Sequence, residues 1–260
     1  MSYKCKYPIV LVHGMVLKDF KLYRAFRKIK DVLKENGIIV YVTNQDGVGT
    51  ISNNAKQLKE EINQIIEKEK VDKVNIIAHS KGGLDARYMI SSLKMDDKVA
   101  SLTTLSTPHR GSNMSRIILK MPKWIASTLA LFINLFYKLF KDKNPDILTL
   151  AHELTDTQMV KFNKDNVNSD KVYYQSYSSD IANKKTFLMI LPRKISKYCE
   201  NDTTDGIVSI SSSAWGDYKG NMDNDYDHAE MVGAYGNKKT LNNVSKFYLN
   251  IVKELQEKGF

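Results

Sequence analysis

Residues 74–83 read Val-Asn-Ile-Ile-Ala-His-Ser-Lys-Gly-Gly, an apolar run that ends in a turn of small residues around Ser80. The stretch that follows, 84–93, is compatible with a helix. A serine at such a strand-to-helix turn is pushed out above the sheet, and small neighbours are needed because the backbone bends sharply there. The pattern predicts a nucleophile at Ser80, although a glycine-rich turn with an incidental serine has the same sequence signature.

Outward from this turn, apolar runs alternate with helical patterns. Four runs in the first half have the character of buried parallel strands, and they cover residues 9–12, 38–42, 74–78 and 102–105. Amphipathic helices are predicted between them over 19–36 and 52–70. Two further strands at 172–177 and 207–210 and a closing helix from about residue 240 complete the pattern. We therefore predict a doubly wound, mostly parallel α/β sheet covered by helices on both faces.

The amino-acid composition restricts which other classes of protein are possible. The 260 residues fit one domain, and the 39 Lys and Arg against 29 Asp and Glu give a formal charge of +10. No basic stripe is interleaved with stacking aromatics, so a nucleic-acid partner is not expected. Cys5 and Cys199 are too few for a disulfide framework or a zinc site. The first seven residues lack the apolar core of a signal peptide, and we expect a cytoplasmic protein or one trimmed of its leader.

Five segments carry a resemblance to a known family. Residues 7–15 (YPIVLVHGM), 74–83, 106–112 (STPHRGS), 204–208 (TDGIV) and 227–228 (DH) are similar, in this order, to the motifs of the bacterial true lipases of the Pseudomonas and Proteus type. The resemblance implies an α/β-hydrolase fold over residues 1–260. It places the catalytic acid at Asp205 and the catalytic histidine at His228.

The chemistry of the residues agrees with this order. A serine hydroxyl needs an adjacent base, and the base needs a third group to fix its tautomer. Ser80, Asp205 and His228 follow one another as α/β-hydrolase triads do, and Asp202 is the rival for the acid. Among the other histidines, His79 is next to Ser80 and is expected to point away from its hydroxyl.

The resemblance also implies secondary features of the site. The backbone N–H groups of Met15 and Lys81 are the expected oxyanion-hole donors. Many relatives bind a structural calcium, for which Glu230 and Asp180 are the candidates here. Their spacing matches poorly, so we expect solvated surface acids, no metal site and no required cofactor.

Residues 112–166 form an insertion that is longer than the usual connection between sheet elements. Its segment 124–140 reads WIASTLALFINLFYKLF and is flanked by the lysines at Lys120, Lys123, Lys141 and Lys143. The segment is short for a transmembrane helix and lies between sheet elements, which argues against a membrane span. A buried core helix and a mobile lid that docks on lipid surfaces are the two remaining interpretations.

We expect a serine hydrolase that cleaves carboxylic esters of lipids through an acyl-enzyme, with interfacial activation. A phospholipase, thioesterase or acyltransferase would use the same triad. A non-catalytic binding module on this scaffold is the rival from another class, although such modules usually lack a triad member. Acyl-chain length and oligomeric state do not follow from the sequence.

Overall fold

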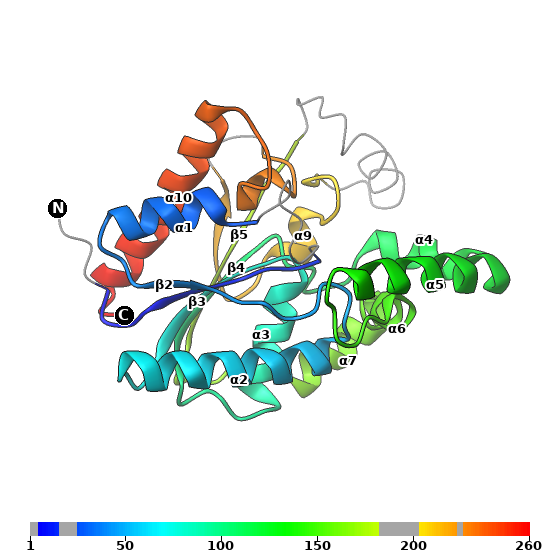
Figure 1. Cartoon of the computed structure of the whole chain (residues 1–260), viewed down its shortest axis with the longest axis horizontal. Helices are drawn as coiled ribbons and strands as arrows, with labels where there is room; N and C mark the ends of the chain where they lie inside the picture. The colour runs from blue at the N-terminus through cyan, green and yellow to red at the C-terminus, as the bar shows by residue number, and fades with distance from the viewer. Residues whose placement is uncertain (1–4, 16–24, 182–202, 223–225) are drawn as a thin grey trace.

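The computed structural model describes residues 5–15, 25–181, 203–222 and 226–260. Within these residues, six parallel strands form one sheet in the order β2-β1-β3-β4-β5-β6 (Figure 1). The strands are β1 (Ile9–Val12), β2 (Val40–Val42), β3 (Val74–His79), β4 (Val99–Leu105), β5 (Tyr173–Ser178) and β6 (Asp217–Asn221). The predicted doubly wound parallel sheet is confirmed.

Helices cover both faces of the sheet. On one face α1 (Arg27–Glu35) packs with α10 (Lys238–Glu257), and on the other α2 (Ile51–Glu69) packs with α3 (Lys81–Ser91) (Figure 1). Each face has its own buried apolar cluster, because the side chains of a strand alternate between the two faces. Every residue of β1, β3 and β4 is buried, as expected for central strands of a parallel sheet.

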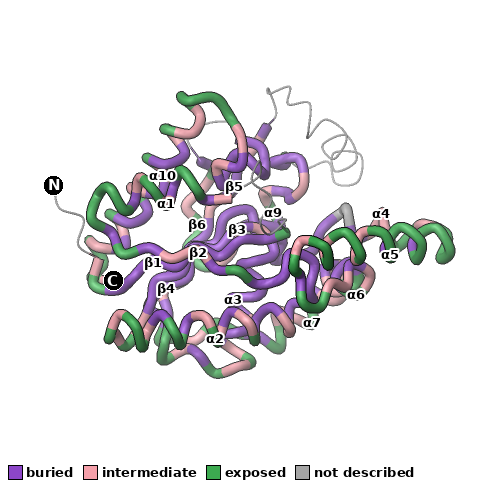
Figure 2. Tube along the Cα trace, viewed as in Figure 1, coloured by how far each residue is buried: buried purple, intermediate pink, exposed green. Residues whose placement is uncertain are grey.

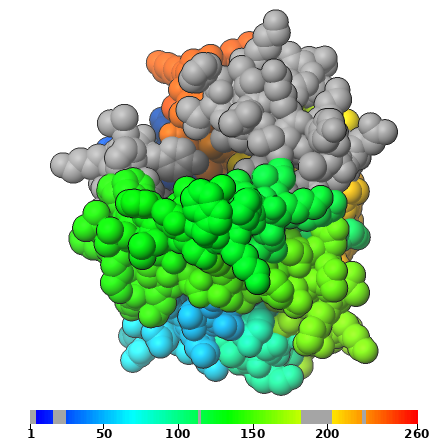
Figure 3. All heavy atoms as spheres, turned by 90° about the vertical axis from the view of Figure 1, so that its right-hand side faces the viewer, coloured from blue at the N-terminus to red at the C-terminus, as the bar shows by residue number. Residues whose placement is uncertain are grey.

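The insertion lies between β4 and β5 and is helical. It consists of α4 (Asn113–Lys120), α5 (Lys123–Leu139), α6 (Ile147–Glu153) and α7 (Asp156–Asp165). In Figure 3 these helices, in green, form a band across one face of the molecule. A third apolar cluster joins α5, α6 and α7 to the beginning of α2, so the insertion packs on the sheet domain through its own small core.

Helix α5 exposes an apolar surface. Of its residues only Ala126 and Ala130 are buried, and Figure 2 shows the helix as largely exposed. Its exposed side chains include Trp124 (73% exposed), Leu131 (66%) and Phe132 (65%). The interpretation as a buried core helix is therefore wrong. None of the described helices is long and apolar enough to span a bilayer.

Two predicted elements differ from the structure. The strand predicted at 207–210 is wrong: Ile207 and Val208 lie in a turn, and the short helix α9 (Ile210–Ser213) follows. Their backbone N–H groups bond to a side chain instead of a neighbouring strand, and both residues line a cavity, which explains their apolar character. The final strand is β6, which the sequence did not predict because its residues are of mixed polarity. The helix predicted over 19–36 begins at Arg27, and residues 19–24 lie outside the described ranges.

Candidate active site

The backbone turns sharply at Ser80, between β3 and α3. Ser80 has φ 54° and ψ −136°, a conformation that is rare for a residue with a side chain. Two close approaches explain the glycines that follow. A Cβ on Gly82 would lie 2.4 Å from the carbonyl oxygen of His13, and one on Gly83 would lie 2.2 Å from Oγ1 of Thr107. The same Thr107 hydroxyl donates to the Ser80 carbonyl at 2.8 Å and holds the turn.

His228 lies two residues before the single-turn helix η1 (Glu230–Val232), within a reciprocal cap. Oδ1 of Asp227 accepts the N–H groups of Ala229 and Glu230 at 3.0 Å each, and Oε2 of Glu230 accepts the N–H of Asp227 at 3.0 Å. The Tyr235 hydroxyl donates to the other carboxylate oxygen of Asp227. The backbone on both sides of His228 is thereby fixed.

The structure brings the three predicted triad side chains together. His228 Nδ1 lies 2.7 Å from Oδ2 of Asp205, and its Nε2 lies 2.9 Å from Oγ of Ser80. An ionised carboxylate only accepts, so Nδ1 carries the proton and Nε2 is left to accept from the serine hydroxyl. Asp205 is fully buried, His228 is 8% exposed and Ser80 is partly exposed. This is the geometry required for activating a serine nucleophile.

Asp205 is held by its own loop. Its Oδ1 accepts the N–H groups of Ile207 at 2.9 Å and Val208 at 2.8 Å, which leaves Oδ2 for the histidine. The N–H of His228 also donates to the Asp205 carbonyl at 3.1 Å and joins the two loops. The rival acid, Asp202, lies outside the described residues.

The ring of His79 packs against His228. The two ring centroids are 4.4 Å apart with an interplanar angle of 48°, so the His79 side chain turns towards the base instead of the serine hydroxyl. Burial and the neighbouring His228 lower the pKa of His79 well below its ordinary value, and its Nε2 has no hydrogen-bond partner. His79 is therefore a neutral ring in contact with the base. Sequence reasoning had assigned it no such contact.

The predicted oxyanion donors flank the serine. A Cβ on Gly14 would lie 2.7 Å from Cβ of Ser80, so the loop that carries Met15 lies directly against the nucleophile. Lys81 is the first residue of α3, where the N–H groups have no partner within the helix and the helix dipole is positive. Met15 and Lys81 line the same cavity as Ser80. Their place suits the binding of a developing negative charge.

An apolar cavity of about 190 Å³ opens beside Ser80. It lies between the nucleophile turn and the insertion, and helices α4 and α6 form its far wall. The aliphatic side chains that line it are Ile118, Ile147, Leu150, Ala151, Leu154, Ile207 and Val208. Sequence reasoning missed these residues, because nothing in their local pattern separates a cavity wall from a helix core.

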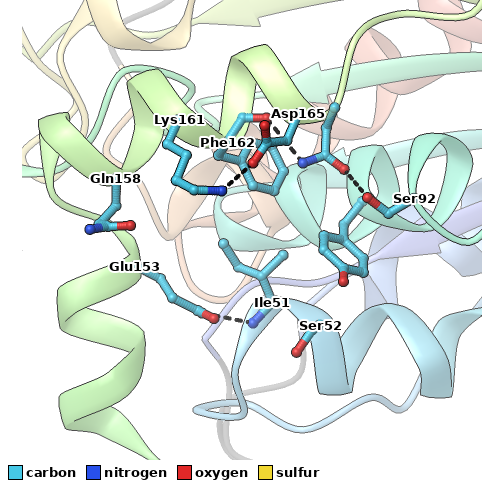
Figure 4. Close-up of a pocket in the computed structure, with 10 residues that line it drawn as sticks. Ile51, Ser52, Ser92, Glu153, Gln158, Lys161, Phe162 and Asp165 are labelled. Carbon is cyan, nitrogen blue, oxygen red and sulfur yellow. Dashed lines mark hydrogen bonds and ion pairs between the residues drawn. The ribbon is translucent and has the colours of Figure 1, made fainter.

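A larger cavity of about 320 Å³ lies elsewhere, between α2, α3, α6 and α7 (Figure 4). Its polar groups bond to one another: Glu153 accepts the N–H of Ile51 at 2.9 Å, and Lys161 is paired with Asp165. None of the triad residues lines it. The reaction site is therefore assigned to the smaller cavity.

The two candidate calcium ligands have different surroundings. Glu230 is buried and serves the cap described above, so the expectation of a solvated surface acid is wrong for this residue. Asp180 is partly exposed after β5. Among the described side chains, no group of three His, Cys, Asp or Glu is placed to hold a metal ion. Cys5 is partly buried and its pKa is raised to about 11 by burial, while Cys199 lies outside the described ranges.

Comparison with known proteins places the chain among lipases and related enzymes. The family model described as palmitoyl protein thioesterase matches residues 8–186. The chain is 35% identical over 258 residues to triacylglycerol lipase 2 of Saccharomyces cerevisiae, a match that covers 89% of this chain and 73% of the yeast protein. It is 31% identical over 172 residues to a triacylglycerol lipase of Pseudarthrobacter phenanthrenivorans, covering 61% of this chain and about half (53%) of that protein's length.

The fold agrees with solved structures. The mature form of the Bacillus licheniformis lipase BlEst2 superposes with a TM-score of 0.70 at 18% identity, and the match covers 95% of this chain and 92% of that one. At this identity the likeness concerns the fold. The motif segments, the helical insertion and the arrangement of Ser80, Asp205 and His228 are thus found together on one scaffold.

Proposed function

Since this chain belongs to the lipase-like α/β-hydrolase family, we propose that it is a lipase that hydrolyses carboxylic esters of lipids through an acyl-enzyme on Ser80. The observation that carries the proposal is the hydrogen-bonded line from Ser80 through His228 to Asp205 beside an apolar cavity. The narrower placement among true lipases of the Pseudomonas and Proteus type is part of the proposal. It is supported by the order of the five motif segments.

The proposed reaction has two halves. Nε2 of His228 takes the hydroxyl proton of Ser80 as Oγ attacks the ester carbonyl carbon, and the N–H groups of Met15 and Lys81 bind the oxyanion. The imidazolium, stabilised by Asp205, then protonates the departing alcohol oxygen, and the acyl group stays on Oγ. Water, deprotonated by His228, attacks the acyl-enzyme, and as the bond from the acyl carbon to Oγ breaks His228 returns the proton to Oγ and the fatty acid leaves. No metal or organic cofactor takes part in this scheme.

The apolar cavity supports an acyl chain as the bound part of the substrate. Its walls are mainly aliphatic, and burial of each methylene group contributes about 0.8 kcal/mol to binding. An acyl carbonyl placed at Ser80 leaves the chain to enter between α4, α6 and the turn at Ile207 and Val208. The alcohol part of the ester would face the partly exposed side of Ser80.

We also propose that the insertion is a lid through which the protein binds lipid surfaces. The exposed apolar side chains of α5 support this, because a patch of this kind on a water-soluble surface marks an interaction site. The lysines at its ends, Lys120, Lys123, Lys141 and Lys143, are exposed and suit anionic head groups. Residues that line the cavity belong to the same insertion, so lipid binding and acyl binding involve one structural unit.

The experiment that tests the substrate class compares four acyl donors at equal concentration. These are short-chain and long-chain p-nitrophenyl esters, a phospholipid and an acyl thioester. The match to the thioesterase family makes the thioester the most informative alternative. The proposal expects the carboxylic esters to have the highest kcat/KM. A clear preference for the phospholipid or the thioester would leave the triad in place and replace the substrate class.

A further inference from the structure

The first turn of α3 contains a buried ion pair. Nζ of Lys81 lies 2.8 Å from both carboxylate oxygens of Asp85, and the two side chains are only 1% and 0% exposed. Burial of both charges costs solvation free energy, which the pairing offsets only while both partners are present. On most helix surfaces a lysine and an aspartate four residues apart are exposed to solvent, whereas this pair is buried.

The ion pair continues into a network that reaches the insertion. Nδ2 of Asn54, on α2, donates to Oδ2 of Asp85 at 3.2 Å and to the carbonyl of Asp46 at 2.5 Å. The carboxylate of Asp46 in turn accepts the N–H groups of Lys143 and Asn144 at 2.8 Å each. These two residues connect α5 to α6, so the network runs from the residue after the nucleophile to the base of the apolar helix.

We propose that Asp85 is a positioning residue for ester hydrolysis, which holds Lys81 so that its backbone N–H faces the oxyanion and which ties this turn to the insertion through Asn54 and Asp46. The inference rests on the proposed function, because it concerns the oxyanion donors of the same site. The side chain of Lys81 then has a role of its own, although sequence reasoning had given weight only to its backbone.

The position of Lys81 explains why its side chain matters. Lys81 adjoins Ser80 and lines the cavity, so any shift of its Cα moves an oxyanion donor. Without Asp85 the ammonium group would be buried without a counter-charge and would move towards water. Misplacement of a catalytic donor by about 1 Å can lower a rate about 100-fold.

The charge of Asp85 also makes the arrangement sensitive to pH. Burial raises the pKa of Asp85 to about 6, and this outweighs the opposing effects of Lys81 and Asn54. Glu153, on α6, faces the same carboxylate and raises its pKa further. As the pH falls through 6, Asp85 takes up a proton and Lys81 loses its counter-charge. The contact of Asp85 with a charged Lys81 is therefore complete only above this pH.

The test uses the full chain and a water-soluble ester, p-nitrophenyl butyrate, with active sites counted by a fluorophosphonate probe. We expect Asp85→Asn to lower kcat per labelled site by about 10- to 100-fold with little change in KM. The double variant Lys81→Met/Asp85→Leu removes both charges and should recover part of this loss. As the pH falls through 6, log kcat should fall more steeply in the wild type than in the double variant, which has no Asp85 carboxylate to protonate.

The chain offers a matched control in Lys161 and Asp165 on α7, which have the same types and spacing but are 71% and 48% exposed. Lys161→Met and Asp165→Asn should keep wild-type kcat. The inference is overturned by unchanged kcat per labelled site in Asp85→Asn, or by identical acid slopes in the wild type and the double variant. If Asp85→Asn does not fold, the comparison of acid slopes between the wild type and the double variant still tests the inference. Failure of the proposed function is a separate result, namely a wild type that neither takes up the probe nor releases nitrophenol.

Discussion

Asp205 uses both carboxylate oxygens for separate tasks. Oδ1 is bound by the N–H groups of its own turn, and Oδ2 faces Nδ1 of His228 at 2.7 Å. The turn therefore orients the Asp205 carboxylate independently of its contact with His228. The tautomer of His228 depends on this one contact, since the proton on Nδ1 leaves Nε2 open to the serine hydroxyl.

Replacement of this acid should have a large effect. In Asp205→Asn the side-chain amide can donate to Nδ1, which forces the proton onto Nε2 and blocks the base. We expect kcat to fall by about 10⁴-fold with the fold retained. The comparison is Asp202→Asn, which removes the rival carboxylate and should leave kcat near the wild-type value. The reverse result in steady-state kinetics would assign the acid to Asp202.

His79 contributes to the site through packing. Its ring is buried against His228 and stays neutral, so it restricts the base without competing for a proton. We expect His79→Phe to retain most of kcat, because the ring contact is preserved. His79→Ala should lower kcat by about 10-fold, the upper range for loss of one aromatic pair. Equal activity of the two variants across pH 6–8 would show that the contact does not position His228.

At the scale of elements, the sequence predicted the central strands correctly, but it did not distinguish a cavity-lining turn or an edge strand from other elements. The buried runs around 9–12 and 74–78 have the length and composition of central strands, and the structure confirms them. The run 207–210 has the same composition, yet its apolar side chains line a cavity and its N–H groups are bound by Asp205. β6 is an edge strand with exposed polar residues, so its sequence resembles a loop. Such cases depend on tertiary contacts that a local pattern does not contain.

The proposed triad residues, which the structure brings together, could be located from the sequence because each lies in a short motif and the motifs follow in a fixed order. The cavity wall could not, since Ile147 and Leu150 reach it only through the packing of α6 over the sheet. Asp85 and Asn54 likewise come from two different helices. Their contact becomes visible only when α2 and α3 are placed side by side, as in Figure 1.

Helix α5 is the element that we predict to bind lipid surfaces. Phe132 and Leu135 are 65% and 57% exposed, so Phe132→Ser/Leu135→Ser should fold normally. Because each side chain contributes about 1.5–3 kcal/mol when it leaves water, we expect binding to anionic vesicles to weaken at least about 10-fold. Activity on emulsified triglyceride should fall, whereas activity on a soluble ester should not.

The matched control for this double variant is Val160→Ser/Val167→Ser, which removes two apolar side chains that are 72% and 64% exposed outside α5. Vesicle binding is followed by sedimentation and by the fluorescence of Trp124. Trp215→Phe is introduced into the wild type and all variants, so that the fluorescence comes from Trp124 alone. If both double variants bind vesicles as the wild type does, the surface of α5 is not the docking site.

At the scale of the whole molecule, one parallel sheet with a core on each face supports residues that are far apart in the sequence. The proposed nucleophile follows β3, while the proposed acid and base lie on two loops near the end of the chain, which are joined by a hydrogen bond between their backbones. In many proteins a structural metal ion holds two such loops together. Here the hydrogen bonds of the reciprocal cap of Asp227 and Glu230 hold the histidine loop.

This arrangement predicts independence from calcium. Excess EGTA should leave both Tm and the activity on a soluble ester unchanged, because Glu230 already bonds within its own turn. Differential scanning fluorimetry with and without added calcium measures the effect. A large fall in Tm that calcium restores would show that a metal binds the folded state.

The central claim is that Ser80 forms the acyl-enzyme, and the most direct measurement is labelling by a fluorophosphonate, located by mass spectrometry, together with turnover of an ester. We predict one label on Ser80 in the wild type, none in Ser80→Ala, and a loss of turnover in this folded variant by a factor of about 10⁶. A label on another residue, or near-normal turnover in folded Ser80→Ala, would contradict the account.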